Sequence, residues 1–267
     1  RKQGKANNSN NKDADFIIKH ADIRRSLMNM KSLIEGQRSL AFWVSQQIDV
    51  SLNHSDTTIK KNANDMVSMM TPLIKSFFTD IGMEITNDAI QVFGGYGYTK
   101  DQGIEQLFRD NRITPIYEGT NSVQAIDLVF RKILNNNIYD NYIAQITKEI
   151  QEYEKNKELV LFVQKFQKYV ELINNFTSWL IEKNKNSKDD VSAACNDYLK
   201  VLGYLGLAHS WLKILKVSYD KYDTNKSFFE DKINTATYYF DKILPRAQSH
   251  YLSAVTGSKS MMKANFN

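Results

Sequence analysis

Apolar side chains recur every three or four residues over most of the chain, which is the spacing of one face of an α-helix. Residues 23–50 show this pattern, with Asp22 as a candidate helix cap. It continues over residues 59–80 and 81–93, where Pro72 predicts either a kink or a helix start near Thr71. The first third of the chain therefore predicts three long helices.

Polar segments interrupt the helical pattern and divide the rest of the chain. Residues 4–15 and 51–58 are predicted loops, and 101–111 and 119–135 are predicted helices. Residues 134–141 are a predicted linker, followed by helical segments over about 140–184, 188–222 and 227–256. Such lengths and short connections predict an all-α fold of two antiparallel helical bundles in tandem, residues 1–135 and 136–267.

Composition limits the classes of function. The chain has 267 residues and a formal net charge of +5 that is spread thinly along it, so nucleic acid is an unlikely partner. No apolar run is long enough to predict a membrane span, and the polar N-terminus does not resemble a signal peptide. Cys195 is the only cysteine, which fits a reducing compartment, and we expect a cytoplasmic location. The four histidines lack metal-ligand spacing, and no metal site is predicted.

The segment 91–128 carries the candidate chemistry. It reads QVFGGYGYTKDQGIEQLFRDNRITPIYEGTNSVQAIDL. Glycines at 94, 95 and 97 predict a helix-ending turn that brings the backbone close to a neighbour or a ligand. Glu118 stands between an apolar-aromatic pair and Gly119, and its bland alternative role is to cap a helix near Thr120.

Three motifs in this segment resemble, in order and spacing, the C-terminal signature of the acyl-CoA dehydrogenase family: QVFGGYGY, FRDNRI and IYEGTNSVQAIDL. The stretch HADIRRSLMNMKSLIEGQRSLA at 20–41 is similar to a preceding helix of the extended, methylthio-propanoyl-CoA dehydrogenase-like subgroup, with Ala21 in place of a proline. The resemblance implies that 1–135 is the family's C-terminal helical domain and 136–267 the subgroup's extension. It also implies an N-terminal helical domain and a middle β-domain that lie outside this chain. We therefore expect the chain to be part of a longer protein.

The resemblance assigns roles to eight residues. Glu118 would be the base that removes the substrate α-proton, and its backbone N–H would polarise the thioester carbonyl. The residues implied for the substrate are Tyr117 and Gly119, and those implied for FAD are Arg1, Gln91, Gly94, Gly95 and Thr120.

The function implied is α,β-desaturation of an acyl-CoA thioester with FAD as cofactor. The implied partners are electron-transferring flavoprotein and a second subunit, in a homodimer or a dimer of dimers. Two alternatives remain open at this point: a non-catalytic or nucleic-acid-linked relative, and a helical oligomerisation module. The chain alone is expected to be inactive and to hold FAD weakly.

Overall fold

The computed structural model describes residues 1–135 and 138–266, and within them it confirms the all-α fold. The chain opens with an antiparallel pair of long helices, α1 (Ala21–Asn53) and α2 (Thr57–Phe93). Helix α1 begins one residue before Asp22, and His20, not Asp22, occupies its N-cap position. The Asp56 side chain caps α2 by accepting hydrogen bonds from the backbone N–H groups of Thr58 and Ile59.

Helix α2 is continuous where the sequence pattern predicts two helices. It passes through Pro72 and through position 80/81 without ending. A proline inside a helix removes one backbone hydrogen bond, but the buried stripe of α2 runs on from Met66 through Leu73 and Phe77 to Ile81. Burial of this stripe outweighs the lost bond, so no new helix starts at Thr71.

Short elements connect the helical pair to the rest of the fold. They are η2 (Gly94–Tyr98), η3 (Lys100–Gln102), α3 (Ile104–Asn111), α4 (Asn121–Ile126) and the π-helical η4 (Asp127–Ile133). The first turn after the chain start is η1 (Ile17–Lys19). Residues 138–141 belong to a helix and not to the predicted linker, whose residues 136–137 lie outside the described part of the chain.

The C-terminal half contains α5 (Ile138–Tyr153), α6 (Val160–Asn186), α7 (Lys188–Asp220), η5 (Tyr222–Thr224), α8 (Lys226–Tyr238), η6 (Tyr239–Ile243), α9 (Arg246–Ala254) and α10 (Lys259–Met262). The predicted single segment 140–184 is thus two helices. Its break lies at 154–159, where the Asn156 side chain accepts a hydrogen bond from the Glu158 N–H and supports a turn. Segment 227–256 is also divided, because Pro245 follows the π-helical η6.

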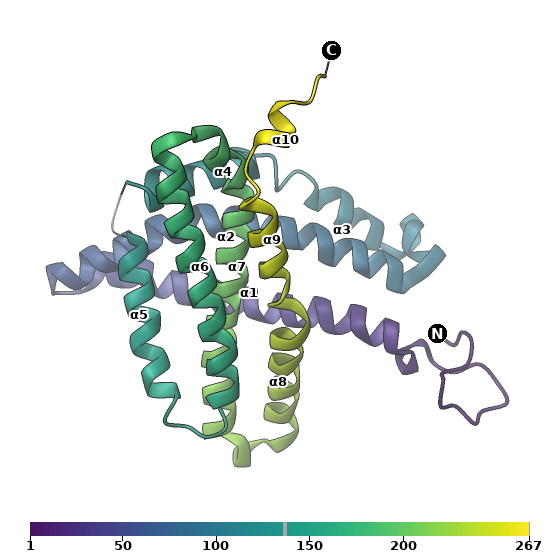
Figure 1. Ribbon diagram of the computed structural model, residues 1–267. Coiled ribbons are helices and arrows are strands. Elements are labelled where there is room, and N and C mark those ends of the chain that lie inside the picture. The colour runs from purple at the N-terminus through teal and green to yellow at the C-terminus, as the bar shows by residue number, and fades with distance from the viewer. Residues whose placement is uncertain (136–137, 267) are drawn as a thin grey trace.

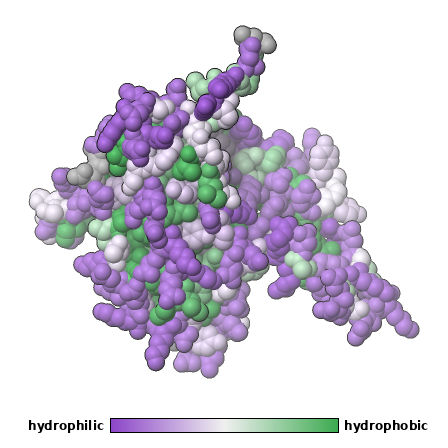
Figure 2. Space-filling model, in the orientation of Figure 1, coloured by the Kyte–Doolittle hydropathy of each residue, from purple (hydrophilic) through white to green (hydrophobic). Residues whose placement is uncertain are grey.

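Helix α7 is the centre of the molecule. Residues 201–212 are all buried, so this stretch is enclosed on every side. Figure 1 shows α1 and α2 running across the molecule, with α5, α6, α7 and α8 crossing them. Buried residues of α1, α2 and α7 belong to one continuous core, represented by Leu40, Phe77 and Trp211. Figure 2 shows mostly hydrophilic residues on the N-terminal loop, while hydrophobic residues gather on the central body.

Candidate active site

Glu118 lies on a tight turn between α3 and α4. It is the only non-glycine residue with a positive φ (56°) in the described chain, and Gly119 follows with φ 82°. The Gln124 side-chain amide donates to the Glu118 carbonyl oxygen at 2.8 Å. This turn leaves the Glu118 side chain exposed, together with Tyr117 and Thr120.

A polar network from α2 holds the turn in place. The Lys75 ammonium donates to the Gly119 carbonyl at 2.7 Å and to the Asn121 side-chain oxygen at 2.8 Å. The buried Asn121 amide donates in turn to the Asp80 carboxylate at 2.7 Å and to the Ser76 carbonyl at 3.1 Å. These charge-assisted bonds anchor the backbone on both sides of Glu118 to one rigid helix.

The alternative structural role for Glu118, that of a helix cap, is wrong. The residue at the N-cap of α4 is Thr120, whose hydroxyl oxygen accepts a hydrogen bond from the Val123 N–H at 3.4 Å. The carboxylate of Glu118 is therefore not used as a cap. Its catalytic role stays a prediction, because the described residues leave the carboxylate exposed and not in the water-poor setting that the prediction requires.

Four of the five residues implied for FAD meet at the C-terminal end of α2. Gln91 is exposed on the last turn of the helix, and Gly94 ends it with φ 67°. Arg1 donates from Nη1 to the carbonyl oxygens of Val92 at 2.7 Å and Phe93 at 2.9 Å. A cation suits this position because the helix C-terminus carries partial negative charge.

The glycine turn cannot carry side chains at every position. A Cβ atom at Gly97 would lie 2.7 Å from the Ile90 carbonyl oxygen, and one at Gly94 would lie 3.0 Å from Arg1 Nη2. Gly95 has no atom within 4 Å of its virtual Cβ, so its backbone faces open space. The turn is packed against α2 on one side and accessible at Gly95.

Asp15 organises the loop beside the chain start, which nothing in the sequence indicated. The predicted loop 4–15 closes around this buried carboxylate, which accepts hydrogen bonds from the Ala6 N–H and the Asn11 side chain and pairs with Lys19 at 3.0 Å. The adjoining backbone bond from Ile17 N–H to Arg1 O then fixes the chain start beside α2.

The structure does not bring all candidate residues together. Thr120, Tyr117, Glu118 and Gly119 lie beside Lys75, whereas Gln91 lies sixteen residues further along α2, about 24 Å away at 1.5 Å per residue. The candidate site thus consists of two clusters, the Glu118 turn and the glycine turn, at separate places on one helix. Lys75 and Asn121 were missed, because a lysine on a helix and an asparagine after a threonine carry no distinctive sequence signal.

Two family models match nearly the whole described chain. "Acyl-CoA dehydrogenase, C-terminal domain" matches residues 6–134, and "Acetyl-CoA dehydrogenase C-terminal like" matches residues 143–265. The chain belongs to the acyl-CoA dehydrogenase family. The Glu118 turn and the glycine turn both lie within the first match.

Similar proteins include several acyl-CoA dehydrogenases. A 3-methylmercaptopropionyl-CoA dehydrogenase of Ruegeria pomeroyi is 40% identical over 46% of this chain and 21% of its own length. A butyryl-CoA dehydrogenase of Syntrophomonas wolfei is 28% identical over 86% of this chain and 39% of its own length. The chain therefore spans between a fifth and two fifths of the length of these relatives.

Solved structures of the family share the fold. The Caenorhabditis elegans ACDH-11 structure in complex with C11-CoA covers 91% of this chain and 40% of its own, with TM-score 0.71 and 17% identity. A Bacillus anthracis acyl-CoA dehydrogenase complexed with FAD covers 94% of this chain and 46% of its own, with TM-score 0.65 and 15% identity. Both are evidence for the helical architecture alone.

Neither a membrane span nor a metal site is found in the described part of the chain. None of its helices has the length and apolar character to cross a bilayer. No group of three or more histidine, cysteine or carboxylate side chains is placed to hold a metal ion.

Proposed function

We propose that this chain is the C-terminal helical part of an FAD-dependent acyl-CoA dehydrogenase and that Glu118 is its catalytic base. The observation that carries this proposal is the Glu118 turn. A carboxylate sits on a strained backbone that Lys75 and Asn121 anchor to α2, in a chain of the acyl-CoA dehydrogenase family. Rigid anchoring of a positive-φ residue is typical of functional sites.

The proposed chemistry assigns a task to each group of this turn. The Glu118 carboxylate takes the α-proton of the acyl thioester, and its backbone N–H donates to the thioester carbonyl, where negative charge develops. Gly119 leaves room for the thioester beside the backbone, and Tyr117 lines its path. Arg1, Gln91, Gly94, Gly95 and Thr120 would hold FAD, which would supply the acceptor for the hydride that leaves the β-carbon, and electron-transferring flavoprotein is the proposed final acceptor.

Exclusion of water from the Glu118 turn would make its carboxylate a stronger base. The carboxylate is exposed here, and removal of water raises the pKa of a carboxylate towards the working pH. The surface around the turn is apolar, with Ile113, Ile116 and Val123 each about half exposed. Such a patch indicates a binding surface, and we propose that further domains of the protein, together with the acyl chain, exclude water there.

The glycine turn fits the pyrophosphate part of FAD. The Gly95 backbone is accessible, and the Arg1 guanidinium beside Gly94 has Nη2 for a phosphate oxygen while Nη1 donates to the Val92 and Phe93 carbonyls. Because this turn lies about 24 Å along α2 from the Glu118 turn, we propose that the two clusters serve different flavins of a homodimer or a dimer of dimers. The exposed Tyr96 and Tyr98 beside the glycine turn would lie in that subunit interface.

The test is a substitution at Glu118 in the complete protein. Glu118→Gln should lower turnover of an acyl-CoA by about 10²- to 10⁴-fold, which is typical for loss of a positioned base. The visible flavin spectrum should be retained. Glu171→Gln, at an exposed position of α6, is the matched control and should turn over normally. Turnover within a few-fold of the unmodified protein in Glu118→Gln would show that another group is the base.

We further propose that residues 1–267 alone bind FAD weakly and are inactive. Only the cluster at the C-terminal end of α2 and Thr120 are available to the cofactor, and Gln91, Gly95 and Thr120 are exposed. Absorbance at flavin wavelengths after gel filtration of the isolated chain checks this, and a tightly retained flavin would contradict it.

A further inference from the structure

A groove of about 510 Å³ lies between α1, α7 and α8. None of the residues that line it belongs to the Glu118 turn or the glycine turn. Its apolar wall is formed by Ile214 and Val217 of α7 and by Phe228 and Phe229 of α8. The two phenylalanine rings meet edge to face at 5.1 Å. Val217 and Phe228 are 48% and 50% exposed, so an apolar ligand that covered them would remove hydrophobic surface from water.

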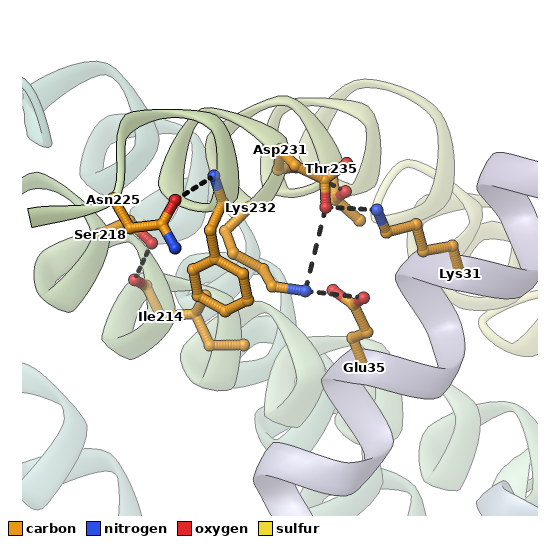
Figure 3. A network of polar contacts seen from close by, with 9 residues as sticks. Lys31, Glu35, Ile214, Ser218, Asn225, Asp231, Lys232 and Thr235 are labelled. Atoms are coloured by element: carbon orange, nitrogen blue, oxygen red, sulfur yellow. Dashed lines mark hydrogen bonds and ion pairs between the residues drawn. The ribbon is translucent and has the colours of Figure 1, made fainter. Parts of the chain in front are cut away.

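Charged residues of one sign dominate the rim of the groove. Arg38, Lys213 and Lys232 line it together with a single carboxylate, Glu35. Figure 3 shows that Lys232 reaches across from α8 to Glu35 of α1, at 2.9 Å, beside the Lys31–Asp231 ion pair. Glu35 and Lys232 thereby neutralise each other.

One unpaired cation remains at the rim. Arg38 makes no ion pair with any described residue. The Lys213 ammonium lies 3.2 Å from the Glu149 carboxylate, which compensates its charge and is also bonded to His209 at 2.7 Å. Lys213 also lies 5.1 Å above the ring of Trp43. The groove therefore combines an exposed apolar wall with one uncompensated positive charge, that of Arg38.

We propose that this groove binds an amphiphilic anion: an aliphatic chain that lies on Ile214, Val217 and Phe228 and ends in a carboxylate at Arg38. The volume of the groove falls within the range of about 300–1,000 Å³ that small-molecule sites occupy. A guanidinium matches the two oxygens of a carboxylate. The site is separate from the Glu118 turn, so this proposal is independent of the catalytic one.

Decanoate, decanol and decyltrimethylammonium separate the contribution of charge from that of the chain. Each is added to the protein below the concentration at which it forms micelles, and tryptophan fluorescence is recorded, because Trp43 lies directly beneath Lys213. We expect saturable binding of one decanoate per chain, at least fivefold weaker binding of decanol, and no saturable binding of the cation. Equal affinity for decanoate and decanol would overturn the proposal.

Substitutions test whether the ligand binds in the groove. Arg38→Ala should weaken decanoate binding by about fivefold, the upper end for an ion pair that water reaches, and leave decanol unchanged. Val217→Asp, at a half-exposed position, should abolish binding of both. Lys168→Ala, at an exposed position of α6, is the matched control and should bind decanoate normally.

Two further results would overturn the proposal. One is decanoate binding that survives Val217→Asp in a variant with unchanged circular dichroism, which would place the ligand elsewhere. The other is a dimer in sedimentation that Val217→Asp dissociates without ligand, which would show that a second copy of the chain occupies the groove.

Discussion

At the scale of single residues, Glu118 stores backbone strain. Positive φ costs a non-glycine residue about 1 kcal/mol or more, and here the bonds from Gln124 to the Glu118 carbonyl and from Lys75 to the Gly119 carbonyl maintain it. A residue type chosen only for stability would be glycine or asparagine. The presence of a glutamate is consistent with selection for its carboxylate.

A substitution at Glu118 should therefore raise stability while it removes the proposed base. Asparagine tolerates positive φ far better than glutamate does. We expect Glu118→Asn to increase the free energy of unfolding by up to about 1 kcal/mol, as measured by urea denaturation. Glu118→Gln keeps the strain and should leave stability unchanged. Equal stabilities of the two variants would mean that the turn is not strained.

At the scale of elements, α7 depends on a close approach to α2. A Cβ atom at Gly203 would lie 2.4 Å from ring atoms of Phe77, which is itself buried. Three residues later, a Cβ at Gly206 would lie 3.3 Å from the flexible end of Leu40. The same residue type thus serves a strict steric role at one position and not at the next turn.

The two glycines of α7 should respond differently to alanine. Gly203→Ala forces Phe77 to move and should lower the free energy of unfolding by about 1–3 kcal/mol, as overpacking does. Gly206→Ala is the matched control: helix propensity favours it by up to about 1 kcal/mol, and Leu40 can shift. Urea denaturation of both variants checks this, and a Gly203→Ala variant as stable as the unmodified chain would contradict the steric role.

Helix α5 is joined to α7 by a polar pair between the buried His209 and the partly buried Glu149. The His209 ring nitrogen Nε2 lies 2.7 Å from Glu149, and the His209 ring is surrounded by Trp43, Tyr142 and Phe166. Burial lowers the pKa of His209, despite the opposing hydrogen bond to Glu149. Burial alone would raise the pKa of Glu149, but bonding to His209 and the nearby charge of Lys213 lower it. We infer that neutral His209 donates to a carboxylate.

Acid should therefore weaken the α5–α7 contact. Below the usual histidine pKa of about 6.5 the unfolded chain binds a proton that folded His209 resists, so stability falls as the pH falls. The slope for one such proton is at most about 1.4 kcal/mol per pH unit. His209→Gln keeps a donor to Glu149 but does not titrate. We expect its loss of stability between pH 7 and pH 5, measured by urea denaturation, to be smaller than that of the unmodified chain.

At the scale of the whole molecule, the two family-model matches share one hydrophobic core. The Trp211 indole N–H of α7 donates to the Ser32 carbonyl of α1 at 3.1 Å, and Gly36 leaves room for the same ring. The Lys31–Asp231 and Arg246–Glu84 ion pairs also join the two parts. The predicted boundary at 135/136 remains a proposal about sequence units, and the packing argues against independent folding.

Separation of the two parts should abolish folding. Residues 1–135 alone would expose the faces of α1 and α2 that cover α7, including Leu40 and Phe77. We expect the intact chain to unfold in one urea transition, coincident by circular dichroism and tryptophan fluorescence. Residues 1–135 and 138–267 expressed separately should show no cooperative transition. Two resolved transitions in the intact chain would contradict a single core.

The sequence by itself determined what depends on local chemistry. Helical spacing predicted most of the helices, because the buried face of a helix requires apolar side chains every three or four residues along the sequence. The motifs around Glu118 and Gly94 indicated the family in the same way, because their residue types stand in a fixed order along the chain.

Tertiary structure decided whatever depends on residues distant in sequence. Helix α2 continues through Pro72, because burial against other helices outweighs one lost hydrogen bond. Tertiary structure also brought Lys75 to Gly119 and Arg1 to the glycine turn, and it merged two sequence units around α7. These outcomes follow from packing and hydrogen bonds between elements, whose partners no local pattern specifies.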